Sequence, residues 1–274
     1  MSEIKHPAIR YHGGKFRMAP YIINHFPDHR CYVEPFGGAA SVLLRKPRSY
    51  AEVYNDLDSD VVNLFAVLRN AAQRERLIEA LILTPYSRCE FLGGYEETDD
   101  VVEKARRLVI RATMGFGSAG ATKGTTGFRL DTKRDSATAQ HLWARMPNNL
   151  AAVGQRFEGV LVENRDAIQV MKDHDAPDTL HFVDPPYVHE TRVISSKYYR
   201  HEMDNEQHLA LLDSVLKLEG KVVICGYETE MYNDILTGWQ KETRQSSAAG
   251  QRGSVKRTEC LWLSPNCQQG VKAA

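Results

Sequence analysis

The chain has 274 residues, of which 42% are hydrophobic and 26% are charged. This composition is ordinary for a globular protein, and the length suits one large domain or one domain that carries an insert. No apolar run approaches the roughly 20 residues of a membrane-spanning helix, so we expect no membrane partner. The first fifteen residues lack the apolar stretch of a secretory signal, and we expect a cytoplasmic protein.

Positive charge is concentrated, although thirty-five Lys and Arg balance thirty-five Asp and Glu and leave a formal net charge of zero. Residues 104–134 hold eight Lys or Arg and one acid, which gives this segment a charge of +7. Such a concentration favours phosphate binding over a merely solvated face. A second basic cluster between the last two predicted strands is expected to contact the same phosphate backbone. Its members are Arg244, Arg252, Lys256 and Arg257.

Cysteine and histidine spacing argues against a metal or a disulfide framework. The five cysteines form no CxxC pair, and the histidines are scattered without the spacing of metal ligands. We therefore expect no metal site, and the cysteines are consistent with a reducing compartment.

The first 70 residues alternate short strands with helices. Strands are predicted at 30–34 and 50–54, and helices at 39–45 and from Asp58 or Ser59 to about residue 68. Residues 70–157 break this rhythm. Helices are predicted there at 71–83 and 101–114, followed by a Gly-rich loop or hairpin at 115–127.

The alternation resumes after residue 157. Strands are predicted at 159–163, 179–183, 221–225, 239–243 and 259–263, and helices at 167–172, after Asp204, and at 228–236. Asp204 and Gln207 form a capping-box pattern at the start of the second of these helices. The pattern predicts an α/β fold with a doubly wound, mostly parallel sheet of seven strands and an insert at 70–157.

The strongest chemical signal is the run Asp184-Pro185-Pro186-Tyr187 at the end of a predicted strand. Ligands of open α/β sheets bind at the carboxyl ends of the strands. The two prolines remove two backbone donors and keep the chain extended. Asp184 adds a carboxylate acceptor and Tyr187 a flat face. Together these groups favour a slot for a planar group that bears an amine.

Three further motifs lie near other strand or helix ends. EPFGG at 34–38 follows the first strand, where glycines let a ligand approach the backbone. NDLD at 55–58 follows the second strand and places Asp56 where an acid commonly binds ribose hydroxyls. HGGK at 12–15 precedes a helix and suits an anion such as a carboxylate. Asp58 and Asp60 are interpreted as helix-capping and first-turn charges.

Taken together, HGGK, EPFGGA, NDLD and DPPY resemble the Dam-type, α-group N6-adenine DNA methyltransferases. The likeness covers most of residues 8–264 and is weakest over 70–157. Two later segments, HLALLDSVLKLEGKVVICGYETEMY and RTECLWL, are similar to the bacteriophage and prophage branch. The resemblance implies a Rossmann-like methyltransferase sheet. It also implies a discontinuous catalytic domain of residues 1–69 and 158–274, and a helical and hairpin target-recognition insert of residues 70–157.

The resemblance implies S-adenosylmethionine as methyl donor, S-adenosylhomocysteine as product and double-stranded DNA as partner. Lys15 is expected near the donor's carboxylate, Asp56 at its ribose hydroxyls and Asp166 near its adenine. The full cofactor-binding set is Tyr11, Lys15, Glu34, Phe36, Gly37, Asp56, Asp166 and Asp184. The catalytic set is Asp184, Pro185, Pro186 and Tyr187. The DNA-binding set, taken from the basic clusters, is Arg111, Lys123, Arg129, Lys133, Arg134, Arg252, Lys256 and Arg257.

The expected reaction is methylation of a flipped adenine at its exocyclic amine, with Tyr187 stacked on the base. N4-cytosine methylation remains an alternative, because it uses a similar slot, and so does a non-catalytic DNA-binding protein on the same scaffold. The segment at 115–129 differs from the hairpin of many relatives, so GATC specificity does not follow. A restriction endonuclease partner or an orphan role, and a monomer or a weak dimer, are left open.

Overall fold

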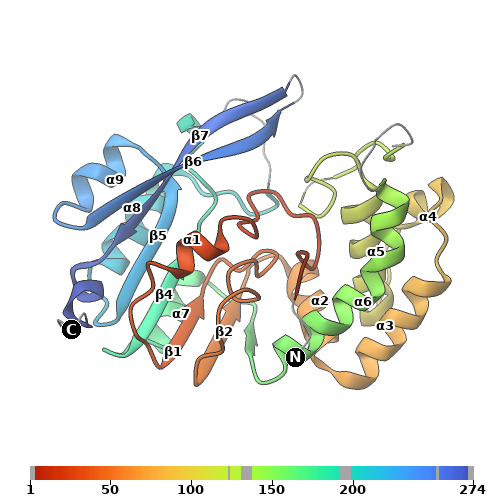
Figure 1. Ribbon diagram of the computed structural model, residues 1–274, viewed down its shortest axis with the longest axis horizontal. Coiled ribbons are helices and arrows are strands. Elements are labelled where there is room, and N and C mark those ends of the chain that lie inside the picture. Colours follow the sequence, from red (N-terminus) through yellow and green to blue (C-terminus); the bar gives the residue numbers. More distant parts are fainter. Residues whose placement is uncertain (1–3, 123, 131–137, 192–198, 251–252, 271–274) are drawn as a thin grey trace.

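A seven-stranded sheet runs through the molecule in the order β3-β2-β1-β4-β5-β7-β6 (Figure 1). The computed structural model describes residues 4–122, 124–130, 138–191, 199–250 and 253–270. β1 to β5 are parallel, and β7 lies antiparallel between β5 and β6. The strands are β1 (Cys31–Glu34), β2 (Ala51–Asn55), β3 (Leu161–Glu163), β4 (Thr179–Val183), β5 (Lys221–Tyr227), β6 (Gln240–Gly250) and β7 (Gly253–Leu263). The predicted α/β class and mostly parallel sheet are confirmed.

Helices cover both faces of this sheet. α7 (Ala167–Asp173), α8 (Asn205–Val215) and α9 (Glu230–Ile235) share a buried cluster with Ile224 and Trp262 of the strands. α1 (Ala19–Ile23) and α2 (Ser59–Arg69) share the other buried cluster with strand residues one position away, such as Cys225 and Leu261. Because successive residues of a strand point to opposite faces, this division makes the fold doubly wound.

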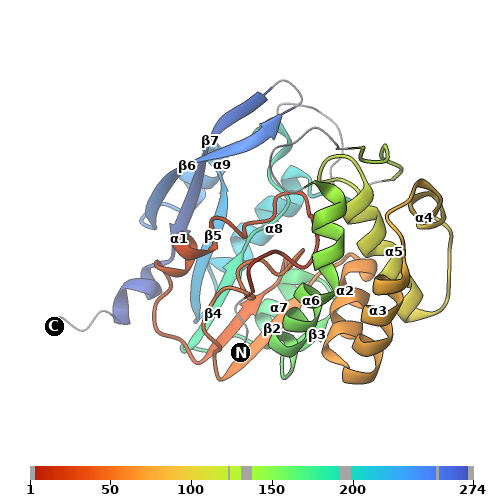
Figure 2. The same cartoon turned by 45° about the vertical axis from the view of Figure 1, so that its right-hand side comes forward.

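Four helices in the described part of residues 70–157 lie together beside the β3 edge of the sheet (Figures 1 and 2). They are α3 (Ala71–Leu83), α4 (Arg88–Gly93), α5 (Val101–Met114) and α6 (Ala139–Phe157). α2 joins them to the sheet, and Phe65 of α2 stacks on Phe157 of α6 with ring centroids 4.4 Å apart. The loop after α5 closes at its base through an antiparallel bridge between Gly115 and Phe128. No helix in the described part of the chain is long and apolar enough to cross a bilayer.

Several expected elements differ from the structure. The helix predicted at 39–45 is wrong: the segment forms turns, because Gly38 and Ala40 have φ of +47° and +52° and interrupt a right-handed helix. The 19-residue helix α6 was not predicted, since Pro147 in its middle resembles a helix break. The capping box of Asp204 and Gln207 is confirmed at the start of α8.

The last two strands are longer than predicted. β6 and β7 form a hairpin paired from Gln240–Leu263 to Gly250–Gly253, and it projects beyond the rest of the sheet (Figure 1). The second basic cluster was expected between these strands. Arg244 lies instead within β6, and Lys256 and Arg257 lie within β7. Arg252 lies outside the described residues.

A buried ion cluster joins α6 to the sheet. The Glu52 carboxylate of β2 accepts two bonds from the Arg156 guanidinium of α6, at 2.6 and 2.8 Å. Lys46 Nζ donates to the same carboxylate at 2.8 Å, and only 1% of the Glu52 side chain is exposed. Removing one partner of such a cluster leaves uncompensated buried charge.

We predict that Glu52→Gln destabilises the protein by about 3–5 kcal/mol, because Lys46 and Arg156 lose their shared anion while the side-chain volume is kept. Denaturant unfolding measures the change. Asp213→Asn is the control, since it removes an exposed pair with Lys217 and should cost less than about 1 kcal/mol. Equal effects of the two substitutions would contradict the structural role of Glu52.

Candidate active site

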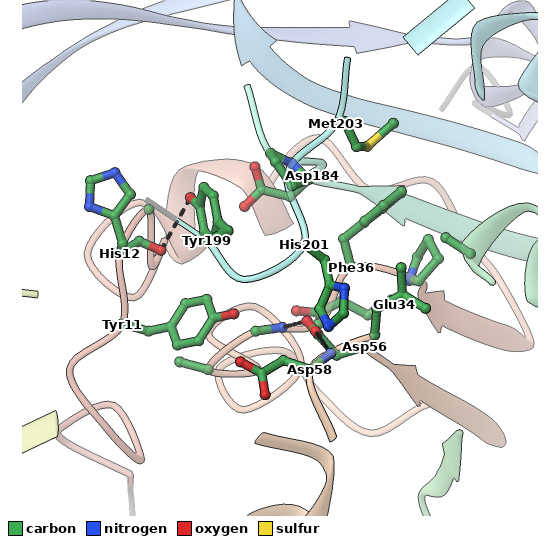
Figure 3. Close-up of a pocket in the computed structure, with 18 of the residues that line it drawn as sticks. Tyr11, His12, Glu34, Phe36, Asp56, Asp58, Asp184, Tyr199, His201 and Met203 are labelled. Atoms are coloured by element: carbon green, nitrogen blue, oxygen red, sulfur yellow. Dashed lines mark hydrogen bonds between the residues drawn. The ribbon is translucent and has the colours of Figure 1, made fainter. Parts of the chain in front are cut away.

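A cavity of about 340 Å³ opens at the carboxyl ends of β1 and β4. The chain leaves β1 toward β2 and β3 on one side and returns at β4 on the other. The loops after β1 and β4 therefore diverge, and the crevice between them is the usual ligand site of such a sheet. All eight residues predicted to bind the cofactor line this one cavity, and Figure 3 labels five of them, Tyr11, Glu34, Phe36, Asp56 and Asp184. The eight residues are Tyr11, Lys15, Glu34, Phe36, Gly37, Asp56, Asp166 and Asp184.

The turn after β1 is held so tightly that only glycine fits there. A Cβ on Gly37 would overlap the Tyr54 ring, and a Cβ on Gly38 would lie 2.8 Å from the Tyr11 ring. Gly38 also has a positive φ of 47°, which L-residues avoid. The Tyr54 hydroxyl donates to the Gly38 carbonyl oxygen at 2.7 Å. Two aromatic rings thus fix the backbone that forms the cavity floor.

Asp56, the residue directly after β2, stabilises the same turn. Its two carboxylate oxygens accept the backbone N–H groups of Gly38 and Asp58, each at 2.8 Å. Burial raises the pKa of Asp56 to about 6, against these hydrogen bonds. Each carboxylate oxygen keeps a second lone pair, so binding of ribose hydroxyls stays a prediction that the geometry permits.

Glu34 contributes a buried carboxyl group to the cavity wall. Its Oε2 accepts the Tyr32 hydroxyl at 2.8 Å and the Leu43 N–H at 3.0 Å. Burial raises the pKa of Glu34 to about 8. The group is therefore mainly a neutral acid at pH 7, able to donate one hydrogen bond as well as accept.

Asp184, directly after β4, forms an ion pair with Lys15. Lys15 Nζ lies 3.1 Å from Asp184 Oδ1, and the two side chains are 8% and 17% exposed. Lys15 Nζ also donates to the Gly13 carbonyl oxygen at 2.9 Å. Burial raises the pKa of Asp184, and Lys15 acts against that rise. The ammonium that we expected beside the donor's carboxylate is thus bonded to Asp184.

The rest of the DPPY motif divides between two environments. Pro186 lines the cavity, whereas Pro185 and Tyr187 are not among its lining residues. The Tyr187 hydroxyl donates to Glu259 Oε2 of β7 at 2.6 Å. Its ring packs edge to face against Tyr227 of β5, with centroids 4.6 Å apart. Lys15 joins Tyr187 to Asp184, because its Nζ is paired with the Asp184 carboxylate and lies 4.7 Å from the Tyr187 ring centroid.

Residues 199–203 line the cavity and were missed by the sequence analysis. Arg200 bonds Asp60 at 2.7 Å and Asp58 at 3.3 Å, which ties this segment to the start of α2. The capping role of Asp58 is confirmed, because its carboxylate accepts the Asp60 N–H at 3.0 Å. No local pattern marks Arg200, since its partners lie some 140 residues earlier in the chain.

Ser41 is a second missed residue of the cavity. Its side chain is 5% exposed, and its hydroxyl oxygen has no hydrogen-bond partner within the described part of the chain. Buried polar groups are nearly always bonded, so this hydroxyl marks a place where a polar ligand atom fits. The cavity therefore combines aromatic and apolar walls, acidic groups and an unmet hydroxyl. This combination of groups suits a ligand that joins a nucleoside to an amino acid, such as S-adenosylmethionine.

The helical part of the basic segment is neutralised, contrary to expectation. Lys104, Arg106 and Arg107 of α5 are bonded to Asp60, Glu90, Glu96 and Glu103. These acids lie outside residues 104–134. The net charge of that segment alone therefore overstates the positive charge available to bind phosphate. Within the described residues, no cluster of three or more His, Cys, Asp or Glu is suited to a metal.

Two residues that are predicted to contact DNA are buried in the structure. Arg111 is 9% exposed and bonds Asp60 at 3.0 Å and the Gly94 carbonyl oxygen at 2.6 Å. Arg129 is 8% exposed. Arg257 is half-buried, with its guanidinium 5.6 Å from the Tyr227 ring centroid. Lys123, Lys133, Arg134, Arg252 and the Lys256 side chain lie outside the described part.

The sheet order and the acid-lined cavity at its switch point define a ligand-binding α/β protein. Residues 11–246 match the family of D12 class N6 adenine-specific DNA methyltransferases. That match spans most of the chain, and the chain belongs to this family.

Individual relatives are similar over shorter segments. A DNA adenine methylase of Escherichia coli K12 is 28% identical over 113 residues, 39% of this chain and 40% of the relative. A DNA adenine methylase of Haemophilus influenzae is 35% identical over 69 residues, 24% of each chain. One of Serratia marcescens is 34% identical over 61 residues, 22% of each chain. The aligned segments thus span less than half of these relatives. A solved precorrin 8w decarboxylase of Methanobacterium thermoautotrophicum has a TM-score of 0.37 and 11% identity over 95% of each chain, too remote to bear on function.

We predict that Glu34→Gln changes how stability depends on pH. A carboxyl whose pKa is raised by folding opposes folding as pH rises from its ordinary value of 4.5 to its folded value of about 8. Between pH 5 and 8 the wild type should lose stability relative to Glu34→Gln, by on the order of a few kcal/mol. Denaturant unfolding at each pH measures this, with the exposed Glu79→Gln as control. Parallel curves for Glu34→Gln and wild type would contradict the assignment.

Proposed function

We propose that this chain is a site-specific DNA methyltransferase that transfers the methyl group of S-adenosylmethionine to N6 of an adenine in double-stranded DNA. One observation carries the proposal: the buried Asp184 carboxylate, paired with Lys15 at 3.1 Å, stands in the wall of a cavity at the switch point of the sheet. Membership of the D12 class supports it.

The cavity residues are proposed to hold the donor. Asp56 would bind its ribose hydroxyls and Asp166 would lie near its adenine. Phe36 and Tyr11 offer aromatic walls, and Ser41 offers the unmet hydroxyl. When bound, S-adenosylmethionine supplies an electrophilic methyl group on its sulfonium. S-adenosylhomocysteine would be left after transfer.

The protein's part in the reaction is to orient an exocyclic amine and to receive a proton. The Asp184 carboxylate and the Pro185 carbonyl oxygen would accept the two N–H bonds, which leaves the nitrogen lone pair free. The amine gains a methyl group and must lose one proton. Asp184 suits that role, because burial raises its pKa. Catalysis then rests on positioning and electrostatics, without a covalent enzyme intermediate.

Residues 70–157 are proposed as the target-recognition insert, and residues 1–69 and 158–274 as the catalytic domain. The hairpin β6–β7 and the loop after α5 rise on the same side of the molecule (Figure 1). DNA bound there would place a flipped base toward Asp184, at a cost of roughly a few kcal/mol for unstacking. The remaining proposed contacts are Lys123, Lys133, Arg134, Arg252, Lys256 and Arg257.

The likeness of RTECLWL and the segment before it to phage and prophage relatives supports a place in that branch. We propose action in the cytoplasm of a prokaryotic or phage-infected cell, as a monomer or weak dimer. The enzyme would act either beside a restriction endonuclease or as an orphan.

We predict that DNA from a methylation-deficient host expressing this chain carries N6-methyladenine at one fixed motif, because Asp184 and Pro185 form the amine slot. Single-molecule sequencing reads the modification, and Asp184→Ala is the control that should abolish it. N4-methylcytosine instead would establish the cytosine alternative. A folded protein that neither modifies DNA nor binds S-adenosylmethionine would favour a non-catalytic DNA-binding protein.

We predict that Arg257→Ala weakens DNA binding and lowers the slope of log affinity against log salt by about 1, as expected for one lost phosphate contact. Arg107→Ala is the matched control, because Glu103 and Glu96 already neutralise Arg107. Fluorescence anisotropy on a plasmid-derived duplex at several salt concentrations measures both. An unchanged slope for Arg257→Ala would contradict the proposal that the β6–β7 hairpin contacts DNA through this residue.

A further inference from the structure

A buried carboxylate outside the donor cavity faces the catalytic motif. Glu259 of β7 is 8% exposed and lies opposite Tyr227 of β5 in the sheet register. Its Oε2 accepts the Tyr187 hydroxyl at 2.6 Å, and Cys225 Sγ lies 3.8 Å from the same oxygen. A carboxylate this deeply buried is costly unless it is well bonded. Its negative charge also acts on Lys15 and Asp184, which line the donor cavity.

The sheet brings this acid to the motif from a distant segment. Residues paired across neighbouring strands point to the same face, so Glu259, Tyr227 and Cys225 share one side of the sheet. Tyr187 packs on that side, four residues beyond the end of β4. The hairpin that begins with β6 thus contributes one anchor to the DPPY motif.

The hydrogen bond to Glu259 restricts the Tyr187 ring in a specific way. The phenol oxygen lies on the axis about which the ring turns, so bonding it fixes the direction of the side chain but not the ring rotation. Two other neighbours flank the ring. Lys15 Nζ lies 4.7 Å from its centroid, and the Tyr227 ring meets it at an interplanar angle of 72°. The hydroxyl also lies 3.3 Å from Cys225 Sγ, and together these contacts hold Tyr187 in one orientation beside Asp184.

We propose that Glu259 is a positioning residue for methyl transfer, which acts by holding the Tyr187 ring as a wall of the amine slot. This inference rests on the proposed function. Glu259 does not line the donor cavity, so its contribution belongs to the orientation of the target base and not to donor binding.

The test compares wild type with Glu259→Gln, Glu259→Ala, Tyr187→Phe and the double variant Tyr187→Phe/Glu259→Ala. Transfer of a tritiated methyl group from S-adenosylmethionine to unmethylated plasmid DNA gives kcat and the donor KM. Glu259→Ala and Tyr187→Phe should each lower kcat by about 10- to 100-fold, the range for a hydrogen bond to a charged group, with donor KM unchanged. Glu259→Gln keeps an acceptor oxygen and should stay within about threefold of wild type.

The double variant separates positioning from a merely structural role. If Glu259 acts through the Tyr187 hydroxyl, the double variant is no slower than the slower single variant. The inference would be overturned if the fold-losses of the two single variants multiplied in the double variant. It would also be overturned if Glu259→Gln were as slow as Glu259→Ala, or if Glu259→Ala kept the wild-type rate. If Glu259→Ala does not fold, the kcat values of Glu259→Gln and Tyr187→Phe still test the inference, because only Tyr187→Phe should be slow. A folded wild type that transfers no methyl group to DNA would instead refute the proposed function.

Discussion

The ion pair between Asp184 and Lys15 is the interaction on which the site depends. An isolated carboxylate at this depth would be expensive to keep charged, and the ammonium 3.1 Å away offsets that cost. The pairing needs the loop after β4 to meet a loop that precedes α1, far away in sequence. The sheet order provides this meeting, because β4 lies directly beside β1 and the chain returns to it after the whole insert.

The walls around this pair share one support, the start of α2. Asp60 bonds Arg111 of the insert helix α5 and Arg200 of the segment after the DPPY motif. Asp56, four residues earlier, holds the glycine turn of the cavity floor. The insert, the floor and the outer wall of the cavity therefore converge on a few acids after β2. Two of these acids were interpreted only as helix charges, and the structure adds ion pairs to that role.

Local sequence patterns predicted most of the helices and strands. The features that these patterns missed are contacts between distant segments of the chain. The bounds of α3, α5 and β4 follow from periodicity and caps, which are local. The eight cavity residues come together because the carboxyl ends of parallel strands share one edge. The pairing of Arg200 with Asp58, of Arg111 with Asp60 and of Glu259 with Tyr187 joins segments about 50 or more residues apart. No sequence window contains both partners.

The most direct test of the account compares donor binding with transfer in the Asp184→Asn protein. Calorimetry with S-adenosylmethionine measures the first, and single-turnover transfer to unmethylated plasmid DNA measures the second. The account predicts donor affinity within about tenfold of wild type, since one cavity contact of many changes, and no detectable transfer. A near wild-type rate of transfer by Asp184→Asn would contradict the claim that transfer needs the Asp184 carboxylate, since the amide keeps an acceptor oxygen but cannot receive the proton.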